Sequence, residues 1–224
     1  MQSILIVVPV LNEALCLPEA LARLKPLVGH LVDLVFVDGG STDDTVGLIE
    51  AAGLRAIPSA KGRAWQMNTG AAQTQADILL FLHADTQLPA GELDSIRSHL
   101  TSTVCWGRFD VRIAGSSRML PVIAGMMNWR SRYSGIATGD QAMFMTRAAF
   151  NAIGGFPQQA LMEDIEASKR LKKLSKPACI SLPVITSGRR WETRGVWPTI
   201  FLMWRLRWAY WRGRNANQLA QLYL

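Results

Sequence analysis

The amino-acid sequence predicts an α/β fold in which a mainly parallel central sheet carries helices on both faces. Short, continuously apolar runs of strand length, typical of parallel strands buried on both sides, alternate with longer stretches of helical character. This alternation implies right-handed crossovers and a doubly wound sheet. Because ligands of such sheets bind beyond the carboxyl ends of the strands, the residues directly after each apolar run are the first candidates for a functional site.

Three strand–helix units are expected in the first half of the chain. The predicted strands are residues 4–9, 34–37 and 78–82, and the helices between them are residues 18–27, 42–52 and 63–74. Ser41 is the expected N-cap of the second helix, and Asp44, three residues later, gives this helix an acidic first turn. The second half is less regular, with strands expected at residues 106–113 and 142–146 and helices at 119–132 and 164–174.

Composition favours one globular domain over residues 1–224. Apolar residues make up 49% of the chain and charged residues 18%, a balance that argues against disorder. The chain has no run of about 18 uncharged apolar residues and no basic segment before its first strand, so neither a spanning helix nor a signal peptide is expected. The three cysteines lack C-x-x-C spacing, which favours free thiols and a cytoplasmic location.

The net charge of +7 predicts an anionic partner. Seven arginines lie between residues 189 and 214, so the basic excess belongs to the C-terminal part of the chain. A protein that binds a nucleic-acid backbone would instead spread its cations more widely. Nucleic-acid binding is therefore not expected.

Carboxylates follow the second and third predicted strands. Asp38 and Asp85 come after apolar runs, where a charge is costly unless it has a partner. Such a carboxylate can accept hydrogen bonds from a nucleoside or ligate a cation. In an extended segment His83 and Asp85 would point the same way, as two ligands of a divalent metal would. The alternative, that acidic loops are helix caps and solvated turns, accounts better for Asp43 and Asp44.

The third predicted helix starts with two cations and a glycine, Lys61, Gly62 and Arg63. Backbone N–H groups and the helix dipole favour an anion there, and both side chains add positive charge. The segment is either a binding site for a diphosphate or a pair of surface cations, and this pattern alone favours neither.

Six motifs follow one another along the chain: P-V-L-N-E, V-D-G-G-S-T-D-D-T, K-G-R, L-H-A-D-T, G-D-Q-A-M-F and M-E-D. This series resembles the family-two glycosyltransferases, especially a compact bacterial branch that ends in an arginine- and tryptophan-rich helix. The resemblance covers essentially the whole chain. It implies the GT-A fold, with a nucleotide-binding half at about residues 1–100 and an acceptor half at about 101–224. The implied activity is inverting transfer of a sugar from a UDP- or GDP-linked donor.

The resemblance also implies roles for individual residues. Seven would contact the nucleotide: Pro9, Leu11, Glu13 and Asp38 around the nucleoside, and Lys61, Gly62 and Arg63 near the ribose or diphosphate. Asp85 would ligate a divalent cation that neutralises the leaving diphosphate. His83 stands where the family has the first aspartate of its D-x-D element, and an imidazole there shifts the expected preference towards Mn²⁺ over Mg²⁺.

Inverting sugar transfer needs a carboxylate that takes the proton of the acceptor hydroxyl. The resemblance assigns this base to Asp164, with Glu163 beside it and Asp140 near the donor sugar and the acceptor. Taken alone, Glu163 and Asp164 could equally be the charge pair that opens a helix. Arg190 and its neighbours occupy the place of an arginine–tryptophan motif that closes over the diphosphate in related enzymes, although the glutamine that leads this motif is not evident.

A C-terminal helix with two apolar faces is expected at residues 198–212. Tryptophans at positions 197, 204, 208 and 211 fall within an arc of about 60°, with arginines on both sides. The opposite face carries Leu202, Met203, Leu206 and Tyr210. One face would pack on the domain. The other would meet the inner face of a membrane, a second subunit as in a homodimer, or the protein's own core, and membrane contact would suit a lipid-linked acceptor.

Two other functions compete with sugar transfer. A nucleotidyltransferase would place a glycine-rich basic loop directly after the first strand, where this chain has L-N-E-A, so we discount it. A non-catalytic nucleotide-sugar-binding or scaffolding protein would keep the fold and lose activity. The presence of Asp85 and Asp164 argues against it, whereas His83 leaves it open. The acceptor itself stays unidentified.

Overall fold

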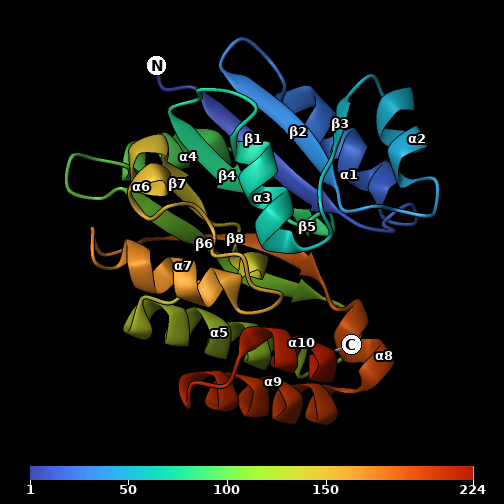
Figure 1. The fold of residues 1–224 in the computed structure, drawn as a ribbon, viewed down its shortest axis with the longest axis vertical. Helices are drawn as coiled ribbons and strands as arrows, with labels where there is room; N and C mark the ends of the chain where they lie inside the picture. The colour runs from blue at the N-terminus through green and yellow to red at the C-terminus, as the bar shows by residue number, and fades with distance from the viewer. Residues whose placement is uncertain (224) are drawn as a thin grey trace.

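The computed structural model describes residues 1–223 and contains an eight-stranded sheet with helices on both faces (Figure 1). The strands are β1 (Ile4–Val10), β2 (Val32–Asp38), β3 (Arg55–Pro58), β4 (Ile78–Phe81), β5 (Thr86–Gln87), β6 (Trp106–Ala114), β7 (Phe144–Thr146) and β8 (Ala178–Ser187). Their order is β3-β2-β1-β4-β7-β6-β8-β5. Strands β3, β2, β1 and β4 pair in parallel, as do β6 and β8, whereas β7 is antiparallel to both neighbours. The predicted α/β class is confirmed.

The helices of the first half are α1 (Leu17–Leu24), α2 (Thr45–Ala51), α3 (Arg63–Ala71) and α4 (Glu92–His99), with a short 3-10 helix η1 (Lys25–Leu27). Those of the second half are α5 (Leu120–Ser134), α6 (Arg147–Ala152), α7 (Glu163–Leu171), α8 (Arg189–Arg194), α9 (Val196–Trp211) and α10 (Ala216–Tyr223), with the 3-10 helix η2 (Gly139–Gln141). None of the helices within residues 1–223 is long and apolar enough to cross a membrane.

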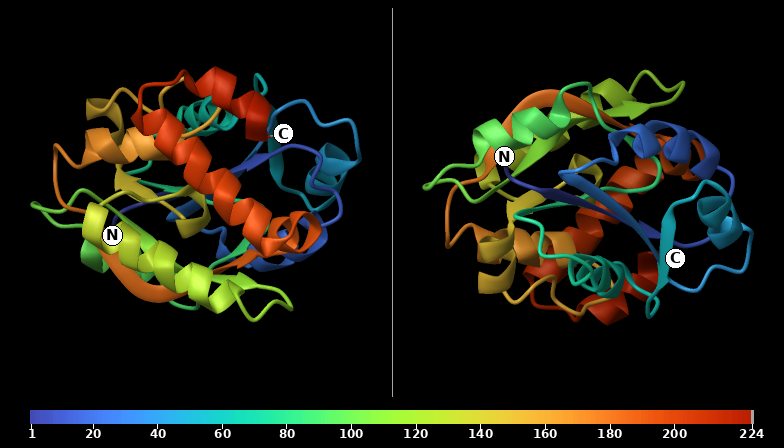
Figure 2. Two further views of the ribbon diagram at one scale, coloured as in Figure 1. Left: turned by 90° about the horizontal axis from the view of Figure 1, so that it is seen from below. Right: turned by 90° about the horizontal axis from the view of Figure 1, so that it is seen from above.

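Alternation along the strands divides the core between the two faces of the sheet. On β1, Ile4, Ile6 and Val8 face the cluster that includes side chains of α1, α2, α4 and α5, whereas Leu5 and Val7 face the cluster under α3, α6 and α7. Views along the long axis show helices flanking the strands (Figure 2). Burial on both faces is the reason why these strands appear as continuous apolar runs.

Helix α2 begins three residues later than expected. The N–H and the hydroxyl of Ser41 both donate to the Asp38 carboxylate, and Asp43 accepts from the N–H and the hydroxyl of Thr45. The predicted N-cap at Ser41 is therefore wrong, because the helix starts at Thr45. Ser41 instead belongs to a turn that holds the carboxylate at the end of β2.

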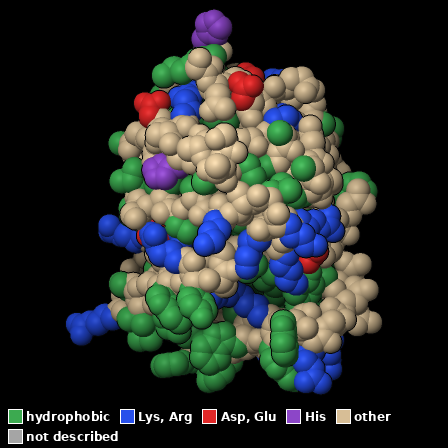
Figure 3. Space-filling view, turned by 90° about the vertical axis from the view of Figure 1, so that its left-hand side faces the viewer, with side chains coloured by type: hydrophobic (Ala, Val, Ile, Leu, Met, Phe, Trp, Pro, Cys, Tyr) green, Lys and Arg blue, Asp and Glu red, His purple; other side chains and the backbone are tan. Residues whose placement is uncertain are grey.

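Helices α5, α9 and α10 lie at the end of the molecule away from the N-terminus (Figure 1). The inner face of α9, with Leu206 and Ala209, packs with Leu219 of α10 on Met162, the residue before α7. The expectation that one apolar face of the C-terminal helix packs on the domain is confirmed. Figure 3 shows hydrophobic side chains gathered on the surface at this end, with lysine and arginine side chains around them.

Candidate active site

The end of β1 and the loop after β2 form one hydrogen-bonded unit. The Asn12 side chain accepts a 2.8 Å hydrogen bond from the Thr42 N–H, and the Asn12 N–H donates to the Ser41 hydroxyl at 2.9 Å. The Glu13 N–H donates to the Thr45 hydroxyl at 2.9 Å. The P-V-L-N-E and V-D-G-G-S-T-D-D-T motifs therefore build a common surface at the carboxyl edge of the sheet.

Asp38 is buried at the end of β2, and its local backbone supplies the partners that its charge requires. The N–H groups of Gly40 and Ser41 donate to its carboxylate at 2.9 and 3.1 Å. Beneath this loop, the Gln66 side chain of α3 donates to the carbonyl oxygens of Val10 and Val37 at 2.8 and 2.7 Å. Gln66 thus fixes the ends of β1 and β2 relative to each other, a role that its sequence context does not reveal.

The K-G-R segment lies at the start of α3. Gly62 has a φ of 133°, a backbone conformation that favours glycine. Lys61 and Arg63 are exposed, and the positive charge of Arg63 acts to lower the pKa of Asp140. Arg63 therefore lies within electrostatic reach of a carboxylate from the second half of the chain.

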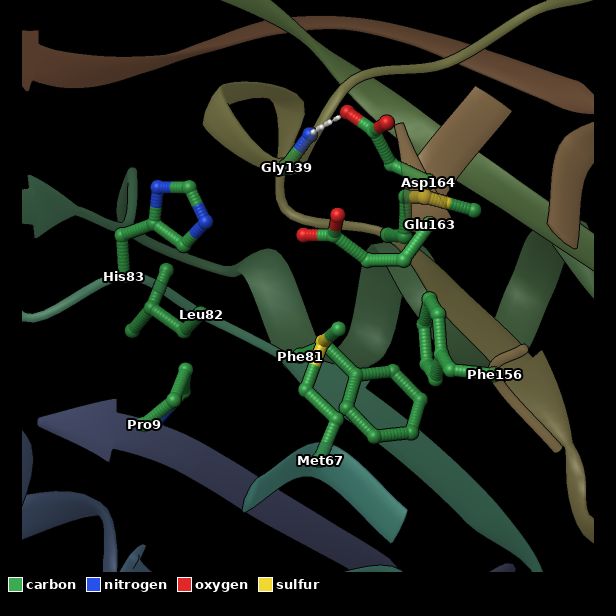
Figure 4. Close-up of a pocket in the computed structure, with 10 residues that line it drawn as sticks. Pro9, Met67, Phe81, Leu82, His83, Gly139, Phe156, Glu163 and Asp164 are labelled. Atoms are coloured by element: carbon green, nitrogen blue, oxygen red, sulfur yellow. Dashed lines mark hydrogen bonds between the residues drawn. The ribbon is translucent and has the colours of Figure 1, made fainter. Parts of the chain in front are cut away.

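A pocket opens beside the carboxyl ends of β1 and β4 (Figure 4). Its apolar wall consists of Pro9, Met67, Phe81, Leu82, Met143 and Phe156. Its polar wall consists of His83, Gly139, Glu163 and Asp164. The structure therefore brings both predicted catalytic carboxylates of the M-E-D motif together with His83, and Pro9 lines this pocket too.

Asp164 and Glu163 differ in how they are held. Asp164 accepts hydrogen bonds from the N–H groups of Gly139 and Ile165 at 3.0 and 2.7 Å, so its carboxylate is oriented. Burial raises the pKa of Asp164, and these hydrogen bonds oppose the rise. Burial and the negative charge of Asp164 raise the pKa of Glu163 to about 7. A pair of carboxyl groups with raised pKa values in a pocket suits proton transfer near neutral pH.

Asp140 pairs with His83, whose Nδ1 lies 3.3 Å from an Asp140 carboxylate oxygen. Burial acts to raise the pKa of Asp140, but the contact with His83 and the charges of Arg63 and Arg190 outweigh it and lower the pKa. The His83 ring also packs closely on Gly139, where an added Cβ would lie 2.5 Å from Nε2. The G-D-Q and L-H-A-D-T motifs are therefore in contact.

His83 and Asp85 do not share one face of an extended segment, and that expectation is wrong. The Thr86 N–H donates to the His83 carbonyl at 3.0 Å, which closes a turn over these residues. His83 lines the pocket of Figure 4, whereas Asp85 lines a neighbouring pocket with Cys16 and Arg189. The turn thus directs the two side chains to different partners.

Asp85 remains suited to a divalent cation. Within residues 1–223, no three His, Cys, Asp or Glu side chains come together closely enough to hold a metal ion by themselves. The Asp85 carboxylate is partly exposed and has the Thr86 hydroxyl 3.4 Å away. One carboxylate with free oxygen lone pairs fits a cation such as Mg²⁺ that takes its remaining ligands from substrate phosphates and water.

Arginines of the second half surround this region. Arg189 Nη2 lies 3.5 Å from the Glu13 carboxylate, which connects α8 to the first motif. The charges of Asp140 and Asp85 act on Arg190, whose Nη1 is buried without a hydrogen-bond partner. On α5, Arg130 has buried Nε and Nη2 atoms without partners, and the charges of Asp164 and Asp140 act on it. Arg130 carries no local motif, so only the fold identifies it.

Three non-glycine residues in the described part of the chain have a positive φ, and all adjoin site motifs. They are Asn12 at 54°, Ala142 at 46° and Met162 at 65°. Asn12 lies in P-V-L-N-E, Ala142 follows the η2 turn and Met162 directly precedes Glu163. The backbone is therefore strained where the site is formed.

Curated relatives match only part of the chain. An undecaprenyl-phosphate 4-deoxy-4-formamido-L-arabinose transferase of Pseudomonas syringae pv. syringae is 33% identical over 99 residues, which are 39% of this chain and 29% of the relative. A glucosyl-3-phosphoglycerate synthase of Mycobacterium tuberculosis is 33% identical over 94 residues, 38% of this chain and 29% of the relative. The match thus spans under a third of the length of these relatives.

Solved structures share the fold. A mannosyltransferase of Pyrobaculum calidifontis, in complex with GDP-Man and Mn²⁺, superposes with a TM-score of 0.64 at 19% identity, covering 93% of this chain and 61% of that one. Glucosyl-3-phosphoglycerate synthase of M. tuberculosis, in complex with Mn²⁺, UDP and glucosyl-3-phosphoglycerate, superposes with a TM-score of 0.59 at 21% identity, covering 81% of this chain and 70% of that one. The expected GT-A fold is confirmed. The model of glycosyl transferase family 2 matches residues 5–154, so the chain belongs to that family.

Proposed function

We propose that the protein transfers a sugar from a UDP- or GDP-linked donor to an acceptor, with inversion at the anomeric carbon. The observation that carries the proposal is the oriented Asp164 carboxylate, which accepts the Gly139 N–H at 3.0 Å in the pocket of Figure 4. A base for inverting transfer must be held in place opposite the leaving group. Family membership supports the same reaction class.

The donor would lie along the carboxyl edge of β1, β2 and β4. In the proposal, the nucleoside contacts the loop surface of Leu11, Glu13 and Asp38, and the diphosphate meets the cationic side chains of Arg63 and Arg190. The partnerless Nη1 of Arg190 supports this assignment, because a buried N–H group without an acceptor is costly until an anion binds. The structural neighbours solved with UDP or GDP-Man are consistent with such a donor.

A divalent cation at Asp85 would neutralise the charge that develops on the leaving diphosphate. Neighbours of this fold were solved with Mn²⁺ and with Mg²⁺, so both ions fit the proposal. The preference for Mn²⁺ depends on His83 as a nitrogen ligand, and its contact with Asp140 weakens that inference.

Asp164 would accept the proton of the attacking group on the acceptor. Glu163 would be protonated in part at neutral pH and could donate a hydrogen bond to the sugar or the acceptor. Arg130, with buried N–H groups free of partners and an electrostatic interaction with Asp164, suits an acceptor that carries an anionic group. A lipid phosphate is such a group, and one relative is named for undecaprenyl-phosphate.

Calorimetric titration of UDP, GDP and ADP, with and without Mn²⁺, tests the donor and the cation together. We expect one nucleotide to bind tightly, and the Mn²⁺-dependent part of its affinity to vanish in Asp85→Asn. The matched control is Asp94→Asn on α4, an exposed carboxylate paired with Arg97. Failure of every nucleotide to bind under either condition would overturn the transferase proposal and favour a non-catalytic role.

A further inference from the structure

An exposed apolar stripe runs along α5. The side chains of Val122, Met126, Trp129 and Tyr133 are 50%, 56%, 69% and 85% exposed. Spacings of four, three and four residues place them on one face of the helix. The Trp129 and Tyr133 rings stack with their centroids 5.9 Å apart. This face is therefore continuous and uncovered.

A second stripe runs along the outer face of α9. It consists of five aromatic side chains that are between 59% and 77% exposed: Trp197, Phe201, Trp204, Trp208 and Trp211. Both helices lie at the same end of the molecule in Figures 1 and 2. We call the two stripes together the aromatic face. Exposed apolar surface of this extent marks an interaction site.

The aromatic face has cations around it and no carboxylate within its helices. Residues 115–139 and 193–224 contain no aspartate or glutamate. The exposed arginines of these segments include Arg118, Arg205, Arg212 and Arg214, and the Arg212 guanidinium lies 5.3 Å from the centre of the Trp208 ring. Figure 3 shows lysine and arginine side chains beside the hydrophobic ones at this end. The complementary partner is negatively charged and apolar beneath its charged layer.

We infer that the aromatic face docks on the surface of an anionic lipid bilayer. Tryptophan, tyrosine and arginine are the residues favoured at the boundary between headgroups and acyl chains. Anionic headgroups would neutralise the arginines while the rings enter the boundary. A symmetric pair of copies joined through this face would instead set arginines against arginines, which disfavours a homodimer.

Helix α5 relates the aromatic face to the site. Trp129 points to solvent, whereas the next residue, Arg130, has buried guanidinium nitrogens and interacts electrostatically with Asp164. A bilayer on the outer side of α5 would therefore lie one helix away from the pocket. Docking itself is independent of sugar transfer; only the delivery of a lipid-phosphate acceptor to Asp164 rests on the proposed function.

Vesicle flotation tests the docking without nucleotide or turnover. The purified full chain is mixed with vesicles of phosphatidylcholine alone or with about 30% phosphatidylglycerol, at low and high salt. We expect binding to the anionic vesicles that weakens with salt. The double variant Trp204→Ser/Trp208→Ser should lower the partition coefficient about tenfold or more. Arg205→Glu/Arg214→Glu should lower it by at least about fivefold per arginine, because each reversal removes an attraction to the anionic surface and adds a repulsion.

Matched controls are Trp65→Ser and Arg55→Glu, an exposed tryptophan and an exposed arginine outside the aromatic face, which should bind vesicles as the unmodified chain does. Circular dichroism and thermal unfolding of every variant verify folding, and because neither readout needs nucleotide binding, the docking test stays separate from that of the proposed function. Absence of binding to anionic vesicles, or equal losses in the controls, would overturn the inference. So would a stable dimer that the double tryptophan variant dissociates, which would assign the face to a second copy.

Discussion

The Gly139 N–H donates to the Asp164 carboxylate at 3.0 Å and so joins the η2 turn to the start of α7. Gly139 is also the residue on which the His83 ring packs, so one backbone position contacts both the oriented carboxylate and the histidine after β4. Motifs that lie far apart in the sequence meet at this position. The same contact defines a sharp test of the proposed base.

Asp164→Asn should abolish most of the turnover and leave the fold unchanged. The amide oxygen can still accept the Gly139 N–H, although the Ile165 N–H then loses its carboxylate acceptor. The amide cannot take a proton, and loss of general-base catalysis costs about 10²- to 10⁴-fold. The measurement is release of UDP or GDP from the donor, with nucleotide affinity determined alongside. Glu166→Gln, two residues further along α7 at a carboxylate that pairs with Lys169 and Arg170, is the control and should stay near the unmodified rate. An Asp164→Asn rate within a few-fold of that value would contradict the assignment.

Glu163 should make folding stability fall as pH rises. Its pKa is raised to about 7 in the folded protein by burial and by Asp164, so the folded chain holds a proton that the unfolded chain releases above its ordinary pKa near 4.5. Stability is therefore lost between about pH 4.5 and 7, by about 2–4 kcal/mol. Urea unfolding at pH 5 and pH 7.5 measures this loss, and Glu163→Gln should reduce it. An unaltered pH dependence in the variant would refute the prediction.

His83 should have little influence on the choice of metal. Its Nδ1 faces Asp140 at 3.3 Å and its ring packs on Gly139, whereas Asp85 lies in the neighbouring pocket. We expect His83→Asn to keep the ratio of Mn²⁺- to Mg²⁺-supported nucleotide affinity nearly unchanged, because an imidazole engaged with Asp140 does not contribute a nitrogen ligand to the cation. A marked shift towards Mg²⁺ in this variant would instead make His83 a ligand and restore the preference for Mn²⁺ expected from the sequence.

Gln66 should contribute to stability through the two carbonyl groups that it satisfies. Gln66→Met keeps the volume and removes both hydrogen bonds to Val10 and Val37, leaving two buried acceptors without these partners. The free energy of unfolding should fall by about 1–3 kcal/mol. Gln73→Met, at an exposed position after α3, should change it by less than about 0.5 kcal/mol. Equal effects in the two variants would disprove the proposed role.

The strands that could be predicted are β1, β2, β4, β6 and β7, although β6 is exposed at Arg112 and Ala114. Strands β1, β2 and β4 appear as apolar runs because helices cover the sheet on both sides. Strand β8 (Ala178–Ser187) escaped prediction because exposed positions and Pro183 interrupt its pattern, and its pairing with β6 shifts register between Phe109 and Asp110. Helix α10 was missed as well, since its apolar contacts exist only once α9 has docked.

Site residues followed the same division. Asp164 and Asp140 lie in local motifs and were therefore candidates from the chain alone, and the charge of Asp140 acts on Asp164 in the structure. Gln66 and Arg130 could not, because their roles depend on carbonyl and carboxylate groups from distant segments. The turn after His83 could not be predicted either, because an apolar run followed by H-A-D is compatible with a strand that continues as well as with a turn.

The positive φ angles of Asn12, Ala142 and Met162 affect which substitutions would raise the thermal stability of this protein in a mutagenesis screen. Strain of this kind costs about 1–3 kcal/mol per residue. Ala142→Gly relieves it with little loss of packing, whereas Met162 packs against α9 and Asn12 accepts the Thr42 N–H, so replacing either removes a stabilising contact. Each of the three positions also shapes a loop of the site. A screen for thermal tolerance that ignores turnover should therefore enrich Ala142→Gly and not changes at Asn12 or Met162, and the enriched variant should turn over more slowly.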